Sequence, residues 1–415
     1  MNYNLKIKVL NAVNKYKDAL NNLGYLTFLQ MVNMLFPFLL YPILINLLGI
    51  ETYGFVIYAT GVALFISVFI SYGYNLSATK LIAENITNKE NVSKVFSTTL
   101  VAKTCLFLLC VLVYLLLIVT LVEKENRFYY YYSIGSLIME VLCPVWLFQG
   151  LNRLKPFVVI NLFSKTLMLI FVIVFVSDVS DIELFLVINF LTSIITGILS
   201  ICAAIRYFDV KYSRVSIDDL VDSFKNGWPI FLSTLLTSIK DRSSIIIVGT
   251  WIGKEYVVIY DIMSKSLGFL SMPQNIIQTA FFPTICKNKN LLEIKKTISV
   301  ILFVNMALVI LSIPFAGFFL EQYFGVNDLL TYVLISSTAI FIGVSSSIAR
   351  FIYIPFHLNE IFLKTLIANL SIFVLLNIIL FGVYSPDSLR PYALILFICS
   401  VCEAIIRLVS VKKKF

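Results

Sequence analysis

The chain has 415 residues, of which 60% are hydrophobic and only 13% are charged, and its mean hydropathy is +0.94. A soluble domain has roughly 45–50% apolar and about 25% charged residues, so this composition excludes a soluble protein and favours an integral membrane protein. The net charge of +9 follows from the basic residues of the inner loops described below, and no nucleic-acid partner is expected.

Apolar stretches long enough to cross a bilayer recur along the whole chain. About 20 helical residues are needed to cross a hydrocarbon core of about 30 Å. Twelve stretches are predicted as membrane-spanning helices: 22–48, 55–78, 96–122, 128–148, 157–177, 182–205, 226–252, 256–283, 298–320, 329–349, 361–383 and 389–411. The connections are all short, so no soluble domain is expected.

The two ends of the chain are basic. Residues 1–21 carry four lysines among scattered apolar residues, without the compact apolar core or small-residue cleavage site of a signal peptide. This segment is predicted to be amphipathic and to lie on the cytoplasmic surface. Residues 412–415 are predicted to form a basic cytoplasmic tail.

The basic residues between the spans set the predicted orientation. With a cytoplasmic N-terminus, the inner segments hold 22 of the 32 Lys and Arg residues. The outer segments hold only Lys124, Arg127, Lys254 and Arg390. Because cytoplasmic loops are enriched in Lys and Arg, both termini are predicted to be cytoplasmic.

A weak internal repeat suggests two halves. The tripeptide at residues 56–58, Val-Ile-Tyr, recurs at residues 258–260, in each case after a Gly-containing outer turn. Repeats with an even number of spans have the same orientation. We therefore expect an N-terminal lobe over 22–205, a cytoplasmic linker over 206–225 and a C-terminal lobe over 226–411. The predicted fold is all-α, with two six-helix bundles around a central cavity.

Ten charged residues are predicted at membrane depth. They are Lys103, Lys165, Lys240, Arg242, Lys265, Arg407, Glu140, Asp241, Asp261 and Glu403. A charge at the bilayer centre costs at least about 2.5–3.5 kcal/mol, so such residues are expected to face protein or water and often mark a transport path.

Depth along the helices suggests partners for several of these charges. Asp241 and Lys265 are each twelve residues from the turn at Gly253, so they could face each other across that hairpin. Glu140 and Lys165 are placed similarly about the turn between the fourth and fifth spans. These two pairs are expected to meet at matching depths.

Two further pairs are spaced four residues apart, Asp261 with Lys265 and Glu403 with Arg407. The second of these is expected mainly to hold helices together. Lys103 lies near an inner helix end, where a lysine side chain can extend to the interface.

The run Lys240-Asp241-Arg242 stands in the middle of the span 226–252. Three consecutive helical residues spread over about 200°, so one neighbouring helix cannot satisfy all three. The seventh and eighth spans together contain three bases and two acids, which leaves a positive patch suited to an anionic substrate. The predicted substrate-binding residues are Lys240, Arg242, Lys265 and Lys165, and those predicted for ion coupling or charge pairing are Asp241, Asp261 and Glu140.

No metal site or other cofactor is expected, because His, Cys and carboxylate residues do not cluster at ligand-like spacings. Two bundles that meet over a central cavity are typical of a transporter, so transport rather than catalysis is expected.

Four stretches resemble Wzx-type polysaccharide transporters, the O-antigen flippases of the MOP exporter superfamily. They are "YPILINLLGIETYGFVIYA" (41–59), "SYGYNLSATKLIAE" (71–84), "PVWLFQGLNRLK" (144–155) and "GWPIFLSTL" (227–235). The resemblance implies twelve helices in two lobes and a location in the bacterial inner membrane. It also implies translocation of an undecaprenyl-diphosphate-linked oligosaccharide, the O-antigen repeat unit, to the periplasmic leaflet. Ion-coupled alternating access driven by a proton or sodium gradient is the expected mechanism.

The same resemblance implies an O-antigen polymerase and a chain-length regulator as partners of a monomeric transporter. The chain departs from the family at Asn46 and Lys80, where relatives often carry Arg, and at Ser71, where an acid is usual. No basic role is therefore carried over to the outer end of the first span.

Two alternatives remain open. A MATE-like exporter of small cationic molecules would share the fold, although a positive cavity would repel such cargo. A membrane polysaccharide polymerase or glycosyltransferase would need a sizeable outer loop, whereas the longest outer connection here is roughly ten residues.

Overall fold

The computed structural model describes residues 3–324, 328–384, 386–412 and 414. Within these ranges it describes side chains from residue 24 onward, except those of residues 283–284 and 323–324. The side chains of the predicted amphipathic segment 1–21 therefore lie outside the described part, as do Lys413 and Phe415 of the predicted tail.

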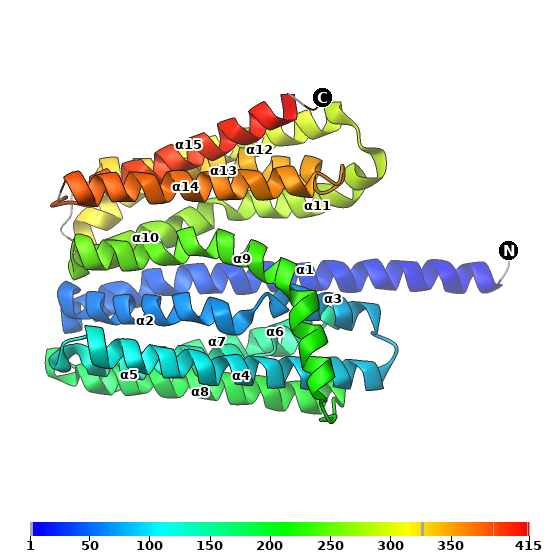
Figure 1. Ribbon diagram of the computed structural model, residues 1–415, viewed down its shortest axis with the longest axis horizontal. Helices are drawn as coiled ribbons and strands as arrows, with labels where there is room; N and C mark the ends of the chain where they lie inside the picture. The colour runs from blue at the N-terminus through cyan, green and yellow to red at the C-terminus, as the bar shows by residue number, and fades with distance from the viewer. Residues whose placement is uncertain (1–2, 325–327, 385, 413, 415) are drawn as a thin grey trace. The chain divides into compact units, whose positions relative to one another are not determined.

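The described residues form α-helices joined by short turns (Figure 1). The helices are α1 (Tyr3–Leu48), α2 (Ile50–Ser71), α3 (Tyr74–Glu84), α4 (Lys89–Leu121), α5 (Arg127–Leu142), α6 (Val145–Gly150), α7 (Lys155–Phe175), α8 (Ile182–Phe208), α9 (Ile217–Trp251), α10 (Lys254–Leu270), α11 (Met272–Asn288), α12 (Leu291–Phe324), α13 (Leu329–Ile348), α14 (Asn359–Val383) and α15 (Arg390–Lys412). A single π-helical turn, η3 (Ala349–Tyr353), follows α13, and no strand occurs among the described residues.

Each of the twelve predicted spans corresponds to one of these helices or to a broken pair of them. The breaks separate α2 from α3, α5 from α6 and α10 from α11. At the first break, Tyr72 and Gly73 adopt left-handed backbone angles, with φ of 45° and 73°. The other two breaks lie beside Pro144 and Pro273, and proline cannot donate the backbone hydrogen bond that would continue a helix.

Ten stretches of the described chain are long and apolar enough to cross a membrane. They match ten of the twelve predicted spans. The other two spans, which correspond to α9 and to α10 with α11, contain the charged residues at 240–242, 261 and 265 and are less apolar. The chain is an all-α, multi-pass membrane protein.

The structure consists of two compact units. Unit 1 comprises Met1–Leu40 and Ala59–Ser238, and unit 2 comprises Tyr41–Tyr58 and Ile239–Phe415. The end of α1 and the beginning of α2 thus group with the later part of the chain. The lobe boundaries expected at 205 and 226 remain a prediction.

Close backbone packing explains this grouping within unit 2. A Cβ atom added to Gly54 on α2 would lie 2.1 Å from the carbonyl oxygen of Lys254, at the start of α10. A Cβ added to Gly249 on α9 would lie 2.1 Å from the Tyr58 ring. These glycines allow α2 to approach α9 and α10 more closely than any larger residue would.

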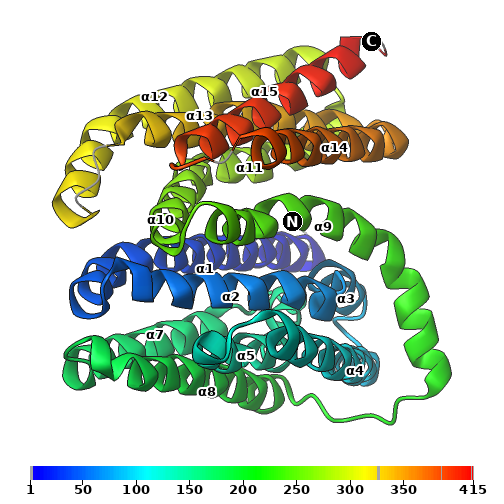
Figure 2. The ribbon, with the colours of Figure 1, turned by 60° about the vertical axis from the view of Figure 1, so that its left-hand side comes forward.

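In unit 1, α8 packs against both α5 and α7, and α4 packs against α5 (Figure 1). In unit 2, α13 packs against α12 and α15, and α14 packs against α15 (Figure 2). Large apolar side chains on α4 and α12, such as Leu112 and Phe303, are exposed, which is the pattern of lipid-facing helices.

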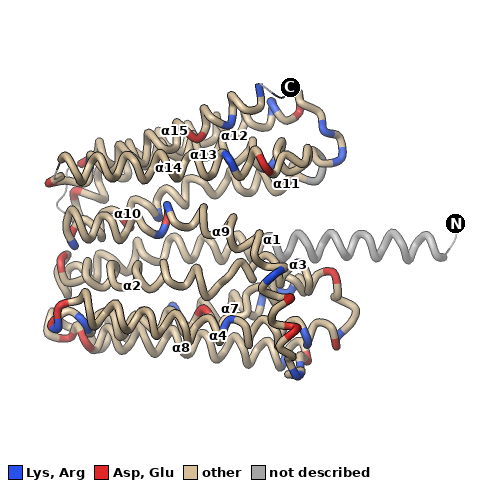
Figure 3. The backbone as a smooth tube through the Cα atoms, in the orientation of Figure 1, with Lys and Arg blue, Asp and Glu red and all other residues tan. Residues whose placement is uncertain are grey.

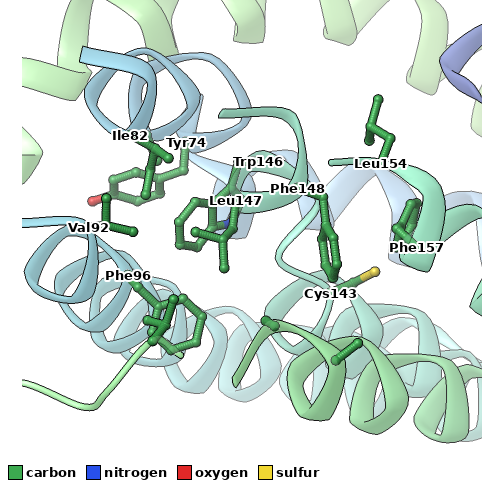
Figure 4. Close-up of a cluster of buried hydrophobic side chains, with 14 of the residues drawn as sticks. Tyr74, Ile82, Val92, Phe96, Cys143, Trp146, Leu147, Phe148, Leu154 and Phe157 are labelled. Atoms are coloured by element: carbon green, nitrogen blue, oxygen red, sulfur yellow. The ribbon is translucent and has the colours of Figure 1, made fainter. Parts of the chain in front are cut away.

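The stretch "PVWLFQG" fills the core at one end of unit 1 (Figure 4). Trp146 and Phe148 of α6 are buried against Phe96 of α4 and Phe157 of α7, with ring centroids 5.9 and 5.7 Å apart, respectively. Gly150 ends this helix against α3, where an added Cβ would lie 2.7 Å from the Ile82 side chain. This part of the family resemblance therefore reflects packing rather than substrate chemistry.

Candidate functional site

Charged residues are concentrated at the helix ends, and few occur in the middle of helices (Figure 3). All ten charged residues predicted at membrane depth lie in the described part of the chain. Their partners differ in several cases from those predicted by depth along the helices.

In unit 1, Glu140 pairs with Lys103 rather than with Lys165. The Lys103 Nζ atom lies 2.8 Å from Glu140 Oε1 and also donates to the Glu140 carbonyl oxygen at 2.7 Å. Lys103 is only 1% exposed, so its side chain does not extend to the interface. Both expectations were wrong because α4 packs against α5 and presents Lys103 directly to Glu140.

Lys165 on α7 lies over an aromatic ring in unit 1. Its Nζ atom is 4.4 Å from the centroid of the Phe36 ring on α1, a cation–π geometry. Asn161 and Ser164 lie on the same helix and are buried. The position of Lys165 is thus set by α1 and α7, and its predicted role in substrate binding remains a prediction.

In unit 2, a buried cluster joins the end of α1 to α10. The Tyr41 hydroxyl and the Lys265 ammonium both donate to Oδ2 of Asp261, and Lys265 Nζ lies 2.9 Å from the Tyr41 hydroxyl. The predicted Asp261–Lys265 pair is confirmed. Tyr53 packs edge-on against Tyr41 with ring centroids 5.1 Å apart, which fixes the tyrosine ring.

Tyr41 is buried, and the Asp261 side chain is 9% exposed, whereas the Lys265 side chain is 28% exposed. The Lys265 side chain is therefore the part of this cluster that is most open to its surroundings. Tyr41 was not identified from sequence as a site residue, although it begins the first stretch that carries the family resemblance.

A second buried cluster in unit 2 centres on Glu403 of α15. Its Oε1 atom is 2.7 Å from Arg407 Nη2, which confirms the predicted pair on this helix. Its Oε2 atom accepts from Asn369 Nδ2 of α14 at 2.6 Å and lies 3.7 Å from Lys240 Nζ of α9. Arg407 also donates to the carbonyl oxygen of Ser345 at 2.7 Å. Lys240 of α9 thus joins a network formed by residues of α13, α14 and α15.

The predicted pairing of Asp241 with Lys265 was wrong, because Lys265 is held by Asp261. Asp241 and Arg242 are both exposed, and neither forms an ion pair with any described residue. Of the three adjacent ions, only Lys240 forms an ion pair with another described residue. The exposed pair cannot face hydrocarbon without a large cost, so this face of α9 requires a polar environment.

The charged residues at membrane depth in unit 2 carry one excess positive charge. The cations are Lys240, Arg242, Lys265 and Arg407, and the carboxylates are Asp241, Asp261 and Glu403. The described residues contain no group of His, Cys, Asp and Glu side chains that could hold a metal ion. This arrangement can attract an anion, and its buried carboxylates can exchange a proton or a small cation.

Comparisons with known proteins identify relatives of this chain. A family model described as "Polysaccharide biosynthesis protein" matches residues 19–289, which is more than half of the chain. The chain is 24% identical over 357 residues to a protein of Escherichia coli (strain K12) named "Putative O-antigen transporter", covering 84% of this chain and 86% of that one. It is also 29% identical over 240 residues to a protein of the same name from Shigella dysenteriae, covering 57% of this chain and 59% of that one.

Solved structures of the MOP superfamily share the fold. The inward-facing conformation of a multidrug resistance MATE family transporter matches with a TM-score of 0.65 at 14% identity, covering 91% of this chain and 97% of that one. A MOP superfamily transporter from Pyrococcus furiosus, whose structure is described as having a binding pocket of reverse polarity, matches with a TM-score of 0.62 at 15% identity. That match covers 95% of each chain.

Proposed function

Because the chain belongs to the polysaccharide biosynthesis protein family, we propose that it moves an undecaprenyl-diphosphate-linked oligosaccharide across the inner membrane. The cargo is the O-antigen repeat unit, and the direction is from the cytoplasmic to the periplasmic leaflet. The curated relatives named as O-antigen transporters support this choice of cargo, and the MOP-type fold supports a transporter rather than an enzyme.

The observation that carries the proposal is the exposed Arg242 in the C-terminal half of α9, which forms no ion pair with a described residue. A guanidinium group presents a fork of N–H donors that matches the oxygens of a phosphate. The diphosphate would therefore be held by Arg242, with Lys240, Lys265 and Lys165 adding positive charge. The polyprenyl tail is apolar and can remain in the lipid.

Ion coupling is proposed for three carboxylates at membrane depth. An ionised Asp261 holds Lys265 and the Tyr41 hydroxyl, so a proton or sodium ion bound at Asp261 would release Lys265 toward the diphosphate. Asp241 and Glu140 are the other candidates, and Glu140 would act through its partner Lys103. Movement of the ion down its gradient would then drive the alternation between inward-open and outward-open states.

The proposed setting is the bacterial inner membrane with both termini in the cytoplasm, supported by the 22 basic residues of the predicted inner segments. The proposed partners are an O-antigen polymerase and a chain-length regulator, which would use the translocated unit. The transporter is proposed to act as a monomer without nucleic acid.

The test is complementation of a deletion strain. Without the protein, lipid-linked oligosaccharide is expected to accumulate on the cytoplasmic leaflet, and the wild-type gene is expected to restore surface polysaccharide. A small-cation exporter would instead change drug sensitivity and leave the lipid-linked pool unchanged. An enzyme that polymerises or transfers sugars would change the structure of the glycan rather than its leaflet.

A further inference from the structure

Unit 1 contains a pocket of about 260 Å³, called here the polar pocket, whose lining includes many polar side chains as well as the apolar residues Ala78, Leu81 and Val95. It lies between α3, the beginning of α4 and the beginning of α9. In the predicted orientation these helix ends are cytoplasmic. Six of the polar residues that line it are Asn85, Asn91, Lys94, Asp219, Asp222 and Asn226.

One wall of the pocket is held by contacts between α9 and the neighbouring helices. Lys94 Nζ lies 2.8 Å from Asp219 Oδ1, and Tyr74 and Ser223 share a hydrogen bond of 3.1 Å. Gly227 lies against Tyr72, where an added Cβ would be 3.2 Å from the ring. The beginning of α9 is thus fixed against α3 and α4, which makes the pocket a built feature.

The Lys94–Asp219 pair leaves the pocket without a free positive charge. The Lys94 ammonium and the backbone and side chain of Ser216 lower the pKa of Asp219 to about 2, so this carboxylate stays ionised and neutralises Lys94. Asp222 forms no ion pair with a described residue and adds a negative charge to the lining. A phosphate or diphosphate would be repelled here.

The remaining polar groups suit a ligand rich in hydroxyl groups. Asn91 donates to Asn85 at 2.9 Å, and these two amides still have donors and acceptors to offer. The Asp222 carboxylate accepts hydrogen bonds, and the Asn226 amide both donates and accepts them. Amide and carboxylate groups that converge on a concave surface can each bind adjacent sugar hydroxyls through two hydrogen bonds.

We propose that this pocket binds one sugar ring of the lipid-linked glycan on the cytoplasmic side. This inference rests on the proposed function, and it gives the glycan of the proposed lipid-linked substrate a binding site of its own. Small-molecule pockets typically begin at about 300 Å³, so a pocket of about 260 Å³ accommodates a single ring and not a whole oligosaccharide.

The test uses the full-length protein in nanodiscs and two probes in equilibrium dialysis. One probe is the oligosaccharide released by mild acid from the host's own lipid-linked repeat unit, and the other is inorganic pyrophosphate. The pocket variants are Asp222→Asn and Asn226→Phe. The matched control is Asp218→Asn, which makes the same charge change on α9 at an exposed residue that does not line the pocket.

Both pocket variants are expected to bind the oligosaccharide at least tenfold more weakly than the wild type and to bind pyrophosphate equally well. Asp218→Asn is expected to bind both probes like the wild type. Arg242→Ala is expected to show the reverse pattern, with pyrophosphate binding weakened and oligosaccharide binding retained. Retention of pyrophosphate binding by the pocket variants also shows that they are folded.

Unchanged oligosaccharide binding in Asp222→Asn and Asn226→Phe would overturn the assignment of the pocket. So would a wild-type protein that binds pyrophosphate but does not bind the oligosaccharide. If the deletion strain accumulates no lipid-linked oligosaccharide, the proposed function itself fails. If the deletion strain accumulates this lipid but the pocket variants bind the oligosaccharide like the wild type, only the assignment of the pocket is refuted.

Discussion

Glu403 of α15 lies 3.7 Å from Lys240 of α9 and 2.7 Å from Arg407 of its own helix. One carboxylate thus compensates two cations, and one of them belongs to the run of three adjacent ions in the C-terminal half of α9. Asp241 and Arg242, the neighbours of Lys240, are exposed and form no ion pair with a described residue. Arg242 is therefore the member of this run whose positive charge is open to an anion.

Replacing Gly54 by Ala is expected to destabilise the protein. The new Cβ would lie 2.1 Å from the Lys254 carbonyl oxygen, so the backbone of α2 or α10 must move, and overpacking of this kind costs about 1–3 kcal/mol. Thermal unfolding in detergent measures the change. The control is Gly382→Ala on α14, where no atom lies within 4 Å of the added Cβ. Equal melting temperatures for the two variants would contradict the close packing of α2.

Replacing Lys103 by Met is expected to destabilise unit 1. The change leaves the Glu140 carboxylate without its partner in the interior, and breaking a buried pair in this way costs about 3–5 kcal/mol. The double variant Lys103→Met/Glu140→Gln is expected to recover much of the lost stability, because no unpaired charge remains. Unfolding titrations of the two variants test this, and a double variant less stable than Lys103→Met would argue against the pair.

The fold was largely predictable from the sequence, because apolar stretches of membrane-spanning length identify helices without tertiary information. The partners of the charged residues were only partly predictable. Spacing of four residues correctly paired Asp261 with Lys265, since both lie on one helix face. Depth failed for Glu140, because it gives the height of a residue along its helix but not the direction in which it faces.

The long-range contacts had no local signal in the sequence. Tyr41 meets Asp261, and Lys240 meets Glu403, only because helices distant in the chain pack together. The polar pocket of unit 1 was missed for the same reason. Its residues lie on three separate helices, and each one alone resembles an ordinary solvated residue near a helix end.

Replacing Tyr41 by Phe is expected to weaken transport while the protein remains folded. The variant keeps the ring that packs against Tyr53 but loses the hydroxyl that donates to Asp261. A hydrogen bond to a charged group contributes about 1.5–3 kcal/mol, so the position of the Asp261–Lys265 pair becomes less well fixed. Flipping rates in proteoliposomes measure the effect. Tyr25→Phe, on the same helix but in unit 1, is the control, and equal rates for both variants would argue against a role for the Tyr41 hydroxyl.

The wall of the polar pocket is expected to be insensitive to pH across the physiological range. The folded-state pKa of Asp219, about 2, lies below its ordinary value of 3.8, so the stabilisation is fully present above the ordinary value. It is lost only as the pH falls from about 5 toward 2 and below. Hydrogen exchange of the first turns of α9, corrected for intrinsic rates, should show equal protection at pH 8 and pH 6.

The variant Lys94→Ala removes the Lys94–Asp219 ion pair. It should therefore lower the hydrogen-exchange protection of the first turns of α9 at both pH values. Lys89→Ala, which removes an exposed lysine one turn earlier on α4, serves as the control. Protection of the wild type that changes between pH 8 and pH 6 would show that another group titrates in this wall.

Arg242 is proposed to hold the diphosphate of the lipid-linked glycan, and single-turnover flipping in proteoliposomes measures this role. Arg242→Ala should reduce the flipping rate at least tenfold, and Arg242→Lys should restore only part of it, because an ammonium group lacks the forked donors of guanidinium. Arg214→Ala in the linker should flip like the wild type. A rate for Arg242→Ala equal to that of the wild type, at equal protein incorporation, would show that Arg242 does not hold the diphosphate.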